Sequence, residues 1–207
     1  MAVSYMDFTS PSTKFTYDLT KNTLFRKNNR NYIYALTSQQ LNTLGNVSML
    51  DVFLSKGNII EPHIHQNASE LVYVASGSVI VSIFNPYTLE FKHYPLSAQQ
   101  AASVPQGWWH YITAREDGTH FLAIFDAPIP QVIYGSDILR FTPPEALART
   151  YCLNQQTVKK AFEPLKDTVV IGPPADCQQP RVQNSPVYRQ QVPLHSYPPE
   201  QYFQSPS

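Results

Sequence analysis

The stretch Gly57-Asn-Ile-Ile-Glu-Pro-His63-Ile-His65-Gln-Asn-Ala-Ser-Glu70, followed by Gly77, decides the fold of this chain. Side chains on a β-strand alternate between its two faces, so His63 and His65 project from one face with about 6 to 7 Å between their Cα atoms. The polar residues 66–69 are few enough to form a turn that returns the Glu70 carboxylate to the two imidazoles. Two imidazoles and a carboxylate at this spacing predict a divalent-metal site on paired β-strands.

A second stretch, Pro105-Gln-Gly107-Trp-Trp-His110, supplies a fourth candidate ligand. His110 lies near the start of a predicted strand over 109–114, with Trp108 and Ile112 on the same face. The same parity argument applied to the neighbouring strands predicts a largely apolar pocket around the four candidate ligands. We expect this pocket to be lined by Ile60, Val72, Trp108, Ile112, Leu122 and Ile124.

The two stretches, G-x5-H-x-H-x4-E-x6-G and P-x-G-x2-H, are the motifs of the cupin superfamily, which the chain resembles. Over residues 32–165 it is similar to the bacterial oxalate decarboxylases and the germin-like proteins, with one barrel where the decarboxylases have two. The resemblance implies an all-β jelly-roll barrel. It also implies manganese held by three histidines and one glutamate, which carries over to His63, His65, Glu70 and His110. Fe, Zn, Ni or Co would suit the same ligand set.

The chain departs from the decarboxylases where that family handles oxalate. Ile60 stands three residues before the first candidate ligand, where the decarboxylases have a substrate-holding arginine and the germins an asparagine. The lid segment over 126–136 lacks the family's proton-handling glutamate, leaving Asp126 and Asp137 as the nearest acids. Between residues 47 and 128 the only basic residues are Lys56, Lys92 and Arg115. Because an unpaired dianion is costly to bury, we expect a neutral or singly charged ligand and absent or trace oxalate turnover.

Runs of β-branched and aromatic residues recur at short intervals through the middle of the chain, a pattern typical of an all-β sandwich or barrel. The predicted strands cover 32–36, 47–54, 70–75, 79–84, 89–94, 109–114 and 120–125. Composition changes on both sides of this region. We therefore divide the chain into an N-terminal arm (1–31), a cupin barrel (32–140), a helical extension (141–171) and an extended or disordered tail rich in Pro, Gln and Tyr (172–207).

Turn and capping residues mark several boundaries. Asn85-Pro86 predicts one β-hairpin, and Arg115-Glu-Asp-Gly118 predicts another. Thr142-Pro-Pro-Glu145 has the pattern of a capping box with proline at the first helical position. A second helix is predicted to start at Asn154.

The 207 residues carry 15 acidic and 15 basic side chains, so the formal net charge is zero. This composition gives no electrostatic footprint for nucleic acid or for an anionic membrane. No apolar run approaches the roughly 18 residues of a membrane span, and the first residues lack the pattern of a secretory signal. We expect a cytoplasmic protein, with deposition in a spore coat as the alternative.

Two classes of function remain open. The first is a metal-dependent enzyme of the oxidoreductase or decarboxylase type that acts on a small oxygenated organic molecule. In it Glu61 is a candidate acid or base, or a residue that supports the ligands, although a solvated turn carboxylate explains it too, and Trp108 either walls the pocket mouth or packs in the core. The second is a non-catalytic structural or binding protein, for example of the spore-coat type. A small-ligand sensor is a third interpretation, but no DNA-binding helix pair is predicted.

We also expect a homodimer or a higher homo-oligomer, because outward aromatic side chains would otherwise form an exposed apolar patch. The residues expected in this interface are Tyr73, Trp109 and Tyr111, together with the helices after Thr142.

Overall fold

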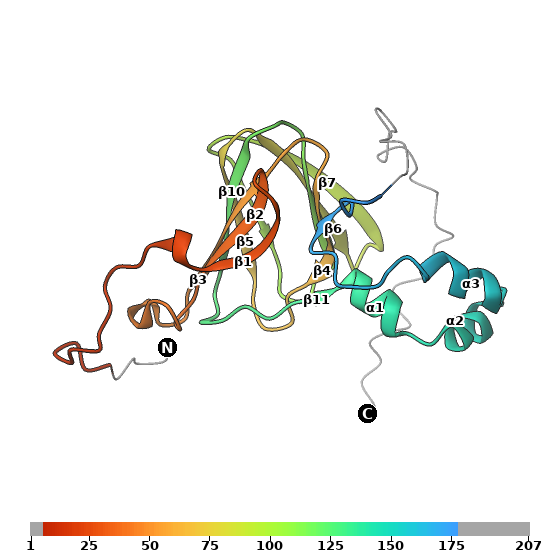
Figure 1. Cartoon of the computed structure of the whole chain (residues 1–207), viewed down its shortest axis with the longest axis horizontal. Helices are drawn as coiled ribbons and strands as arrows, with labels where there is room; N and C mark the ends of the chain where they lie inside the picture. The colour runs from red at the N-terminus through yellow and green to blue at the C-terminus, as the bar shows by residue number, and fades with distance from the viewer. Residues whose placement is uncertain (1–5, 178–207) are drawn as a thin grey trace, which may run out of the picture.

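The structure is a computed structural model that describes residues 6–177, so most of the tail expected over 172–207 lies outside the described residues. Two antiparallel β-sheets face each other and enclose the core (Figure 1). The prediction of an all-β jelly roll with short C-terminal helices is confirmed.

The first sheet has six strands in the spatial order β1, β2, β3, β10, β5 and β8. Their bounds are β1 (Thr23–Asn28), β2 (Asn31–Leu36), β3 (Ser48–Leu54), β10 (Thr119–Phe125), β5 (Glu70–Ser76) and β8 (Ala101–Val104). β1 lies within the range expected to form an arm, yet it pairs with β2. Its side chains are mostly exposed, so it lacks the apolar alternation by which a strand is recognised in a sequence. Short 3-10 helices occupy Leu19–Lys21 and Asn42–Leu44.

The second sheet also has six strands, with the order β11, β4, β9, β6 and β7, and β12 added beside β4. Their bounds are β11 (Ile133–Tyr134), β4 (Ile59–Ile64), β9 (His110–Ala114), β6 (Ser78–Asn85), β7 (Glu90–Ser97) and β12 (Ile171–Gly172). The hairpin predicted at Asn85-Pro86 joins β6 to β7. The hairpin predicted at Arg115–Gly118 is wrong, because this turn leads from β9 in the second sheet to β10 in the first.

The core lies between the sheets and consists of the inward residues of alternating strands, such as Val52, Val72, Val81, Ile112 and Phe121, each at most 2% exposed. Where β5 turns into β6, Gly77 has φ +73, and a Cβ there would lie 2.8 Å from the Thr119 Cα. This close approach explains why the motif requires glycine at that position.

The ladder between β4 and β9 contains a β-bulge. Ile60 pairs with Ile112 and His63 pairs with His110, so three steps along β4 match two along β9. As a result Ile60 and Glu61, although adjacent, are both buried. The bulge lets β4 direct Ile60 into the core and still present His63 on the inner face.

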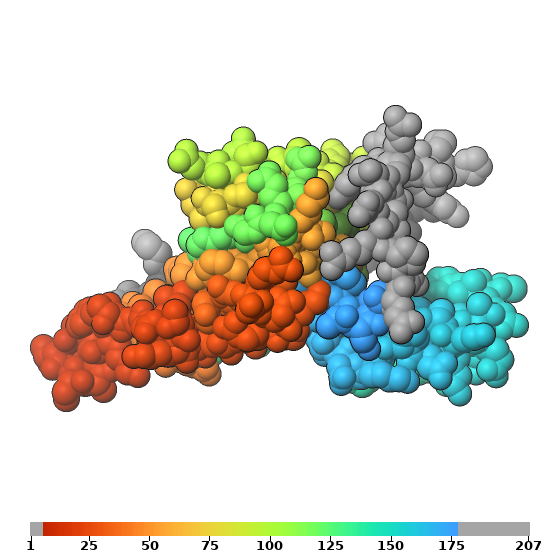
Figure 2. Space-filling view, turned by 45° about the horizontal axis from the view of Figure 1, so that its top comes forward, coloured from red at the N-terminus to blue at the C-terminus, as the bar shows by residue number. Residues whose placement is uncertain are grey.

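Three short helices follow the barrel: α1 (Gly135–Phe141), α2 (Pro144–Tyr151) and α3 (Gln155–Phe162). They lie to one side of the barrel, and the N-terminal segment lies on the other (Figures 1 and 2). The predicted start at Asn154 is confirmed, because its side chain accepts a hydrogen bond from the Thr157 N–H at 3.0 Å. The capping box at Thr142 is wrong. Its hydroxyl instead donates to the Ile138 carbonyl at the end of α1, and Pro143 is the N-cap of α2.

A buried carboxylate fastens the segment that runs from α1 to β12 to the barrel. The Glu61 side chain accepts hydrogen bonds from the Ser136 N–H (2.8 Å), the Ser136 hydroxyl (2.9 Å) and the Val170 N–H (2.7 Å). Immediately after Val170, β12 pairs with β4. Both ends of the segment from α1 to β12 are therefore held on β4, the strand that carries His63. In the part of the chain that the structure describes, no helix is long and apolar enough to span a membrane.

Candidate metal centre

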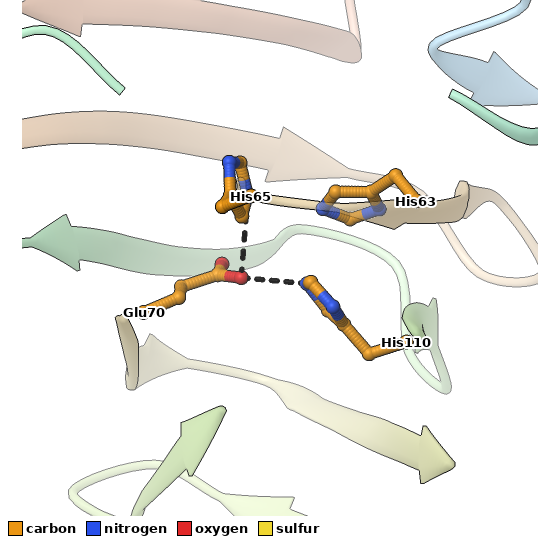
Figure 3. Close-up of side chains that lie close together, drawn as sticks. All are labelled: His63, His65, Glu70 and His110. Carbon is orange, nitrogen blue, oxygen red and sulfur yellow. Dashed lines mark hydrogen bonds and ion pairs between the residues drawn. The ribbon is translucent and has the colours of Figure 1, made fainter. Parts of the chain in front are cut away.

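His63, His65, Glu70 and His110 converge between the two sheets (Figure 3). His63 is near the end of β4, His65 directly follows it, Glu70 opens β5 and His110 opens β9. One potential ligand atom from each residue lies within 4.8 Å of all the others, and all four side chains are buried. The turn expected over 66–69 does return the carboxylate to the imidazoles.

Each of the three imidazoles is anchored through its Nδ1 atom to a backbone carbonyl. The acceptors are Glu61 O for His63 (2.7 Å), Gln131 O for His65 (2.8 Å) and Trp108 O for His110 (2.8 Å). A carbonyl only accepts, so Nδ1 carries the proton in each ring, and each neutral ring has its lone pair on Nε2. Such anchoring fixes the tautomer and the orientation of metal-binding histidines.

The Glu70 carboxylate lies among these lone pairs. Its Oε2 atom is 2.7 Å from the His110 Nε2 and 3.6 Å from the His65 Nε2 (Figure 3). A carboxylate and an Nε2 lone pair both accept, so they approach this closely only when a proton or a metal cation lies between them. The donor set therefore fits a divalent metal of the borderline type that nitrogen and oxygen ligands share.

Burial and mutual charge shift the pKa values of the cluster in opposite directions. Burial lowers the pKa of His63 to about 3, and it also lowers the pKa of His65. Burial alone would lower the pKa of His110 and raise that of Glu70, but their hydrogen bond and opposite charges reverse both effects. The pKa of His110 is raised and that of Glu70 falls to about 2. The lowered pKa values favour neutral His63 and His65 in the metal-free protein, and the 2.7 Å approach of His110 to Glu70 places a proton between them.

The end of β10 and the segment after it contact the cluster and the turn beside it. The Phe125 ring lies 4.6 Å from the His65 ring, measured between centroids. The Asn67 side chain donates to the Ile129 carbonyl at 3.0 Å and accepts from the Gln131 N–H at 2.8 Å. These two bonds hold the segment on the turn that carries His65, and so place the Gln131 carbonyl against the His65 ring.

The expected pocket lining is reproduced only in part. Val72 and Ile112 face inward and are buried, as is Ile60. Trp108 is partly buried and lines a separate cleft beside the cluster. Leu122 and Ile124 were expected to face inward, which is wrong. They pair with Tyr73 and Leu71 on the outer face of the first sheet.

The error at Leu122 and Ile124 is one of parity. Phe125 pairs with Glu70, so Phe121, Ala123 and Phe125 are the inward residues of β10, and all three are buried. Residues 121–125 of this strand are apolar on both faces, so alternation alone does not identify the inner face. Only the register with β5 does so.

Of the three accounts of Glu61 given by the sequence, that of a residue supporting the ligands agrees with its position. Its side chain is 7% exposed, which excludes a solvated turn carboxylate. Its two oxygens are occupied by the Ser136 and Val170 donors, and its backbone carbonyl anchors His63. Its contacts are those of a positioning residue.

The backbone acceptors at Gln131 and Trp108 and the tether at Asn67 were not expected. A backbone carbonyl leaves no mark in a sequence, so only Asn67 had a signal available. Asn67 lies in the polar stretch between two candidate ligands, where an amide side chain commonly bonds to a neighbouring backbone.

The fold and the site together define a jelly-roll barrel with an interior set of three histidines and one glutamate suited to a metal. The cupin family model matches residues 19–159, and the chain belongs to the cupin family.

Two curated relatives are similar in sequence. Germin-like protein 1-2 of Oryza sativa subsp. japonica is 32% identical over 123 residues, which cover 57% of this chain and 54% of the relative. Oxalate decarboxylase OxdC of Bacillus subtilis (strain 168) is 28% identical over 182 residues, which cover 81% of this chain and 46% of the relative. The chain thus spans about half the length of the curated relatives it matches.

Two solved structures resemble the chain in fold. The coconut allergen cocosin superposes with a TM-score of 0.72 at 24% identity, covering 80% of this chain and 46% of cocosin. A structure concerned with the Mn(II) centres of Bacillus subtilis oxalate decarboxylase gives a TM-score of 0.66 at 24% identity, covering 78% of this chain and 44% of the decarboxylase. At these identities the similarity shows the fold alone.

Proposed function

We propose that the protein binds a divalent metal through the Nε2 atoms of His63, His65 and His110 and the carboxylate of Glu70, and that it is a metal-dependent enzyme. The observation that carries the proposal is the anchoring of all three Nδ1 atoms by backbone carbonyls. It leaves three lone pairs and a carboxylate within 4.8 Å of one another. When bound, the metal supplies Lewis acidity toward an oxygen donor of the substrate. Manganese is the metal we propose, supported by the Mn(II) centres of the structurally similar decarboxylase.

The proposed substrate is a small oxygenated organic molecule other than oxalate. Ile60 pairs with Ile112 of β9 and with Ile171 of β12, and its apolar side chain is buried in the core with theirs. Asp126 accepts from the Ser69 N–H, and Asp137 pairs with Arg140. Among the ion pairs within residues 6–177, none joins the cluster to a lysine or an arginine. A dianion would therefore have the metal alone for charge compensation.

A non-catalytic role is the second candidate, and the covering segment favours it. Asn67 and Ser69 hold that segment closed over the cluster through hydrogen bonds at its two ends. In this case the metal would mainly link β4, β5 and β9, and the protein would serve in an assembly such as a spore coat. If the protein is catalytic, the covering segment would have to open to admit a substrate. We propose that such an enzyme acts inside the cell.

Self-association as a homodimer or higher oligomer belongs to the same proposal. Leu71 and Tyr73 on the outer face of the first sheet are 43% and 37% exposed, and Leu122 and Ile124 lie beside them. A sheet face of this composition favours contact with a second copy over contact with water.

Metal content and turnover test the proposal together. Protein loaded separately with Mn, Fe, Co, Ni or Zn would be measured for bound metal by mass spectrometry and for decarboxylation or oxygen uptake with a panel of small organic acids and alcohols. We expect about one metal per chain, and loss of most of it in His65→Ala. His93→Ala removes a histidine outside the cluster and should keep the metal. Stoichiometric metal in His65→Ala would refute the ligand assignment. Full metal content in the wild-type protein without turnover of any compound would refute the enzymatic role and favour the structural one.

A further inference from the structure

A cleft of about 280 Å³ opens beside the metal cluster, between the edge strand β7 of the second sheet and the edge strand β8 of the first. Its walls include Ile83, Lys92, Tyr94, Ala102 and Trp108. The proposed metal chemistry does not involve this cleft.

The cleft exists because the two edge strands differ in length. β7 runs for eight residues along β6, whereas β8 runs for only four along β5. Lys92 pairs with Ile83 and Tyr94 with Val81, so both face the barrel interior, yet both remain exposed. The shorter β8 leaves part of the inner face of β7 uncovered.

Lys92 is the charged group of the cleft. It shares a face with Ile83, which is 6% exposed, and in the chain from residue 6 to 177 it forms no ion pair. An ammonium without a carboxylate partner beside an apolar wall attracts an anion, and the Tyr94 and Trp108 rings beside it suit a flat apolar body.

The wall of the cleft is also the support of a metal ligand. Ile83 pairs with His110 across the ladder between β6 and β9. The carbonyl of Trp108 accepts the hydrogen bond that orients the same histidine. A molecule in the cleft therefore contacts the two residues that flank His110.

From these contacts we propose that the cleft binds a small organic monocarboxylate, with its carboxylate at Lys92 and a flat apolar or aromatic body against Tyr94 and Trp108. The volume lies near the lower end of the roughly 300–1,000 Å³ typical of ligand pockets, so the body has on the order of ten non-hydrogen atoms. The binding of this carboxylate does not depend on the proposed function.

Calorimetric titration with benzoate tests the site, with benzamide as a neutral molecule of the same shape. We expect wild-type protein to bind benzoate more tightly than benzamide. Lys92→Met should weaken benzoate about tenfold and leave benzamide unchanged, because it removes a charged hydrogen-bond donor and keeps the side-chain stem. Lys92→Arg should restore the affinity. Lys56→Met, which removes a lysine at a turn outside the cleft, is the matched control and should have no effect.

The same titration on His65→Ala separates the cleft from the metal. Lys92-dependent benzoate binding that persists in His65→Ala places the carboxylate in the cleft, even if metal analysis has refuted the proposed function. Benzoate binding that disappears in His65→Ala and is unchanged in Lys92→Met would place the carboxylate on the metal and overturn the proposal. Absence of benzoate binding to wild-type protein at millimolar concentration would overturn it as well. Self-association of Lys92→Met with unchanged benzoate affinity would show that Lys92 only protects the β7 edge, which also contradicts the proposal.

Discussion

Two buried glutamates of this barrel, Glu61 and Glu70, lie nine positions apart and have opposite surroundings. Glu61 faces only donors: two N–H groups and one hydroxyl complete its hydrogen bonding. Glu70 faces imidazole nitrogens whose other ring atoms have already donated to carbonyls. The first environment is complete as it stands, whereas the second needs a proton or a metal cation.

This difference shows how a structural carboxylate and a metal-binding carboxylate can be told apart at equal burial. Both side chains are less than 10% exposed, so burial does not distinguish them. The identity of the neighbouring atoms does, because backbone N–H groups neutralise a carboxylate by donation, whereas Nε2 lone pairs add to its demand for positive charge. Substitutions at the two sites should therefore affect different properties.

The largest expected effect is on folding, at Glu61. In Glu61→Gln one carboxylate oxygen becomes an NH₂ group that faces the N–H of Ser136 or Val170, so a donor meets a donor. We expect a loss of about 3 kcal/mol in the free energy of unfolding, measured by urea denaturation. Metal content per folded molecule should stay at the wild-type level. Loss of metal at unchanged stability would mean that Glu61 belongs to the site after all.

The next effect is on metal affinity, at Glu70. Glu70→Gln keeps the shape but removes the charge, and we expect metal affinity to fall about a hundredfold. The free energy of unfolding of the metal-free protein should change by less than in Glu61→Gln. Competition with a metal-binding dye measures the affinity. Glu116→Gln is the control, because within residues 6–177 its carboxylate accepts a hydrogen bond only from the Ser78 hydroxyl.

A smaller effect is expected in the pH dependence of the metal-free protein. His63 has a folded pKa of about 3, below its ordinary 6.5, so its contribution to stability is full above pH 6.5 and is lost as the pH falls toward 3. Glu70 adds a loss between its ordinary 4.5 and about 2. The raised pKa of His110 acts on the alkaline side and does not oppose this loss. Stability should fall by about 1 to 2 kcal/mol between about pH 6.5 and pH 5.

Urea midpoints across this pH range provide the measurement. His63→Asn should reduce the loss in the free energy of unfolding as the pH falls. His93→Asn, on the edge strand β7, should retain most of that loss. An equal slope in wild-type and His63→Asn protein would contradict a neutral His63 in the metal-free state.

The smallest effect is in the protons released when the metal binds. The His110 Nε2 and the Glu70 Oε2 lie 2.7 Å apart, so in the metal-free protein they share a proton, which must leave before both can act as ligands. We expect release of about one proton per metal near neutral pH. Titration calorimetry in buffers with different ionisation enthalpies counts these protons. Release that is unchanged in Glu70→Gln would mean that the proton comes from elsewhere.

Spacing predicted the cluster because its members occur in two short motifs whose parity is local. His63 and His65 are two apart, and one turn leads to Glu70, so no long-range register is needed to bring three of the four residues together. The side chains of β10 are different. Their facing depends on how β10 pairs with β5, and for Leu122 and Ile124 the sequence has no local anchor.

The role of Glu61 depends on contacts that are still longer in range. Its partner Val170 lies 109 positions away, and the bulge that buries it is recognised only from the pairing of β4 with β9. The strand β1 was not predicted for a related reason, because an exposed edge strand lacks the apolar face by which a strand is recognised in a sequence. Local chemistry was therefore predictable, whereas closure of the barrel by distant segments was not.

The two shortest strands have a consequence for assembly. β11 pairs with β4 at His63 and Ile64, and β12 pairs with it at Ile59 and Ile60, so the outer edge of β4 is occupied at both ends. A free strand edge is a template for pairing with another chain. The strand that carries His63 is thus shielded from edge-to-edge association by these two-residue strands. Among the longer strands that the structure describes, β1, β7 and β8 end their sheets with an unpaired side. Domain swapping or fibril growth in this protein would begin at these longer edges, and loss of the Glu61 contacts would expose the edge of β4 as well.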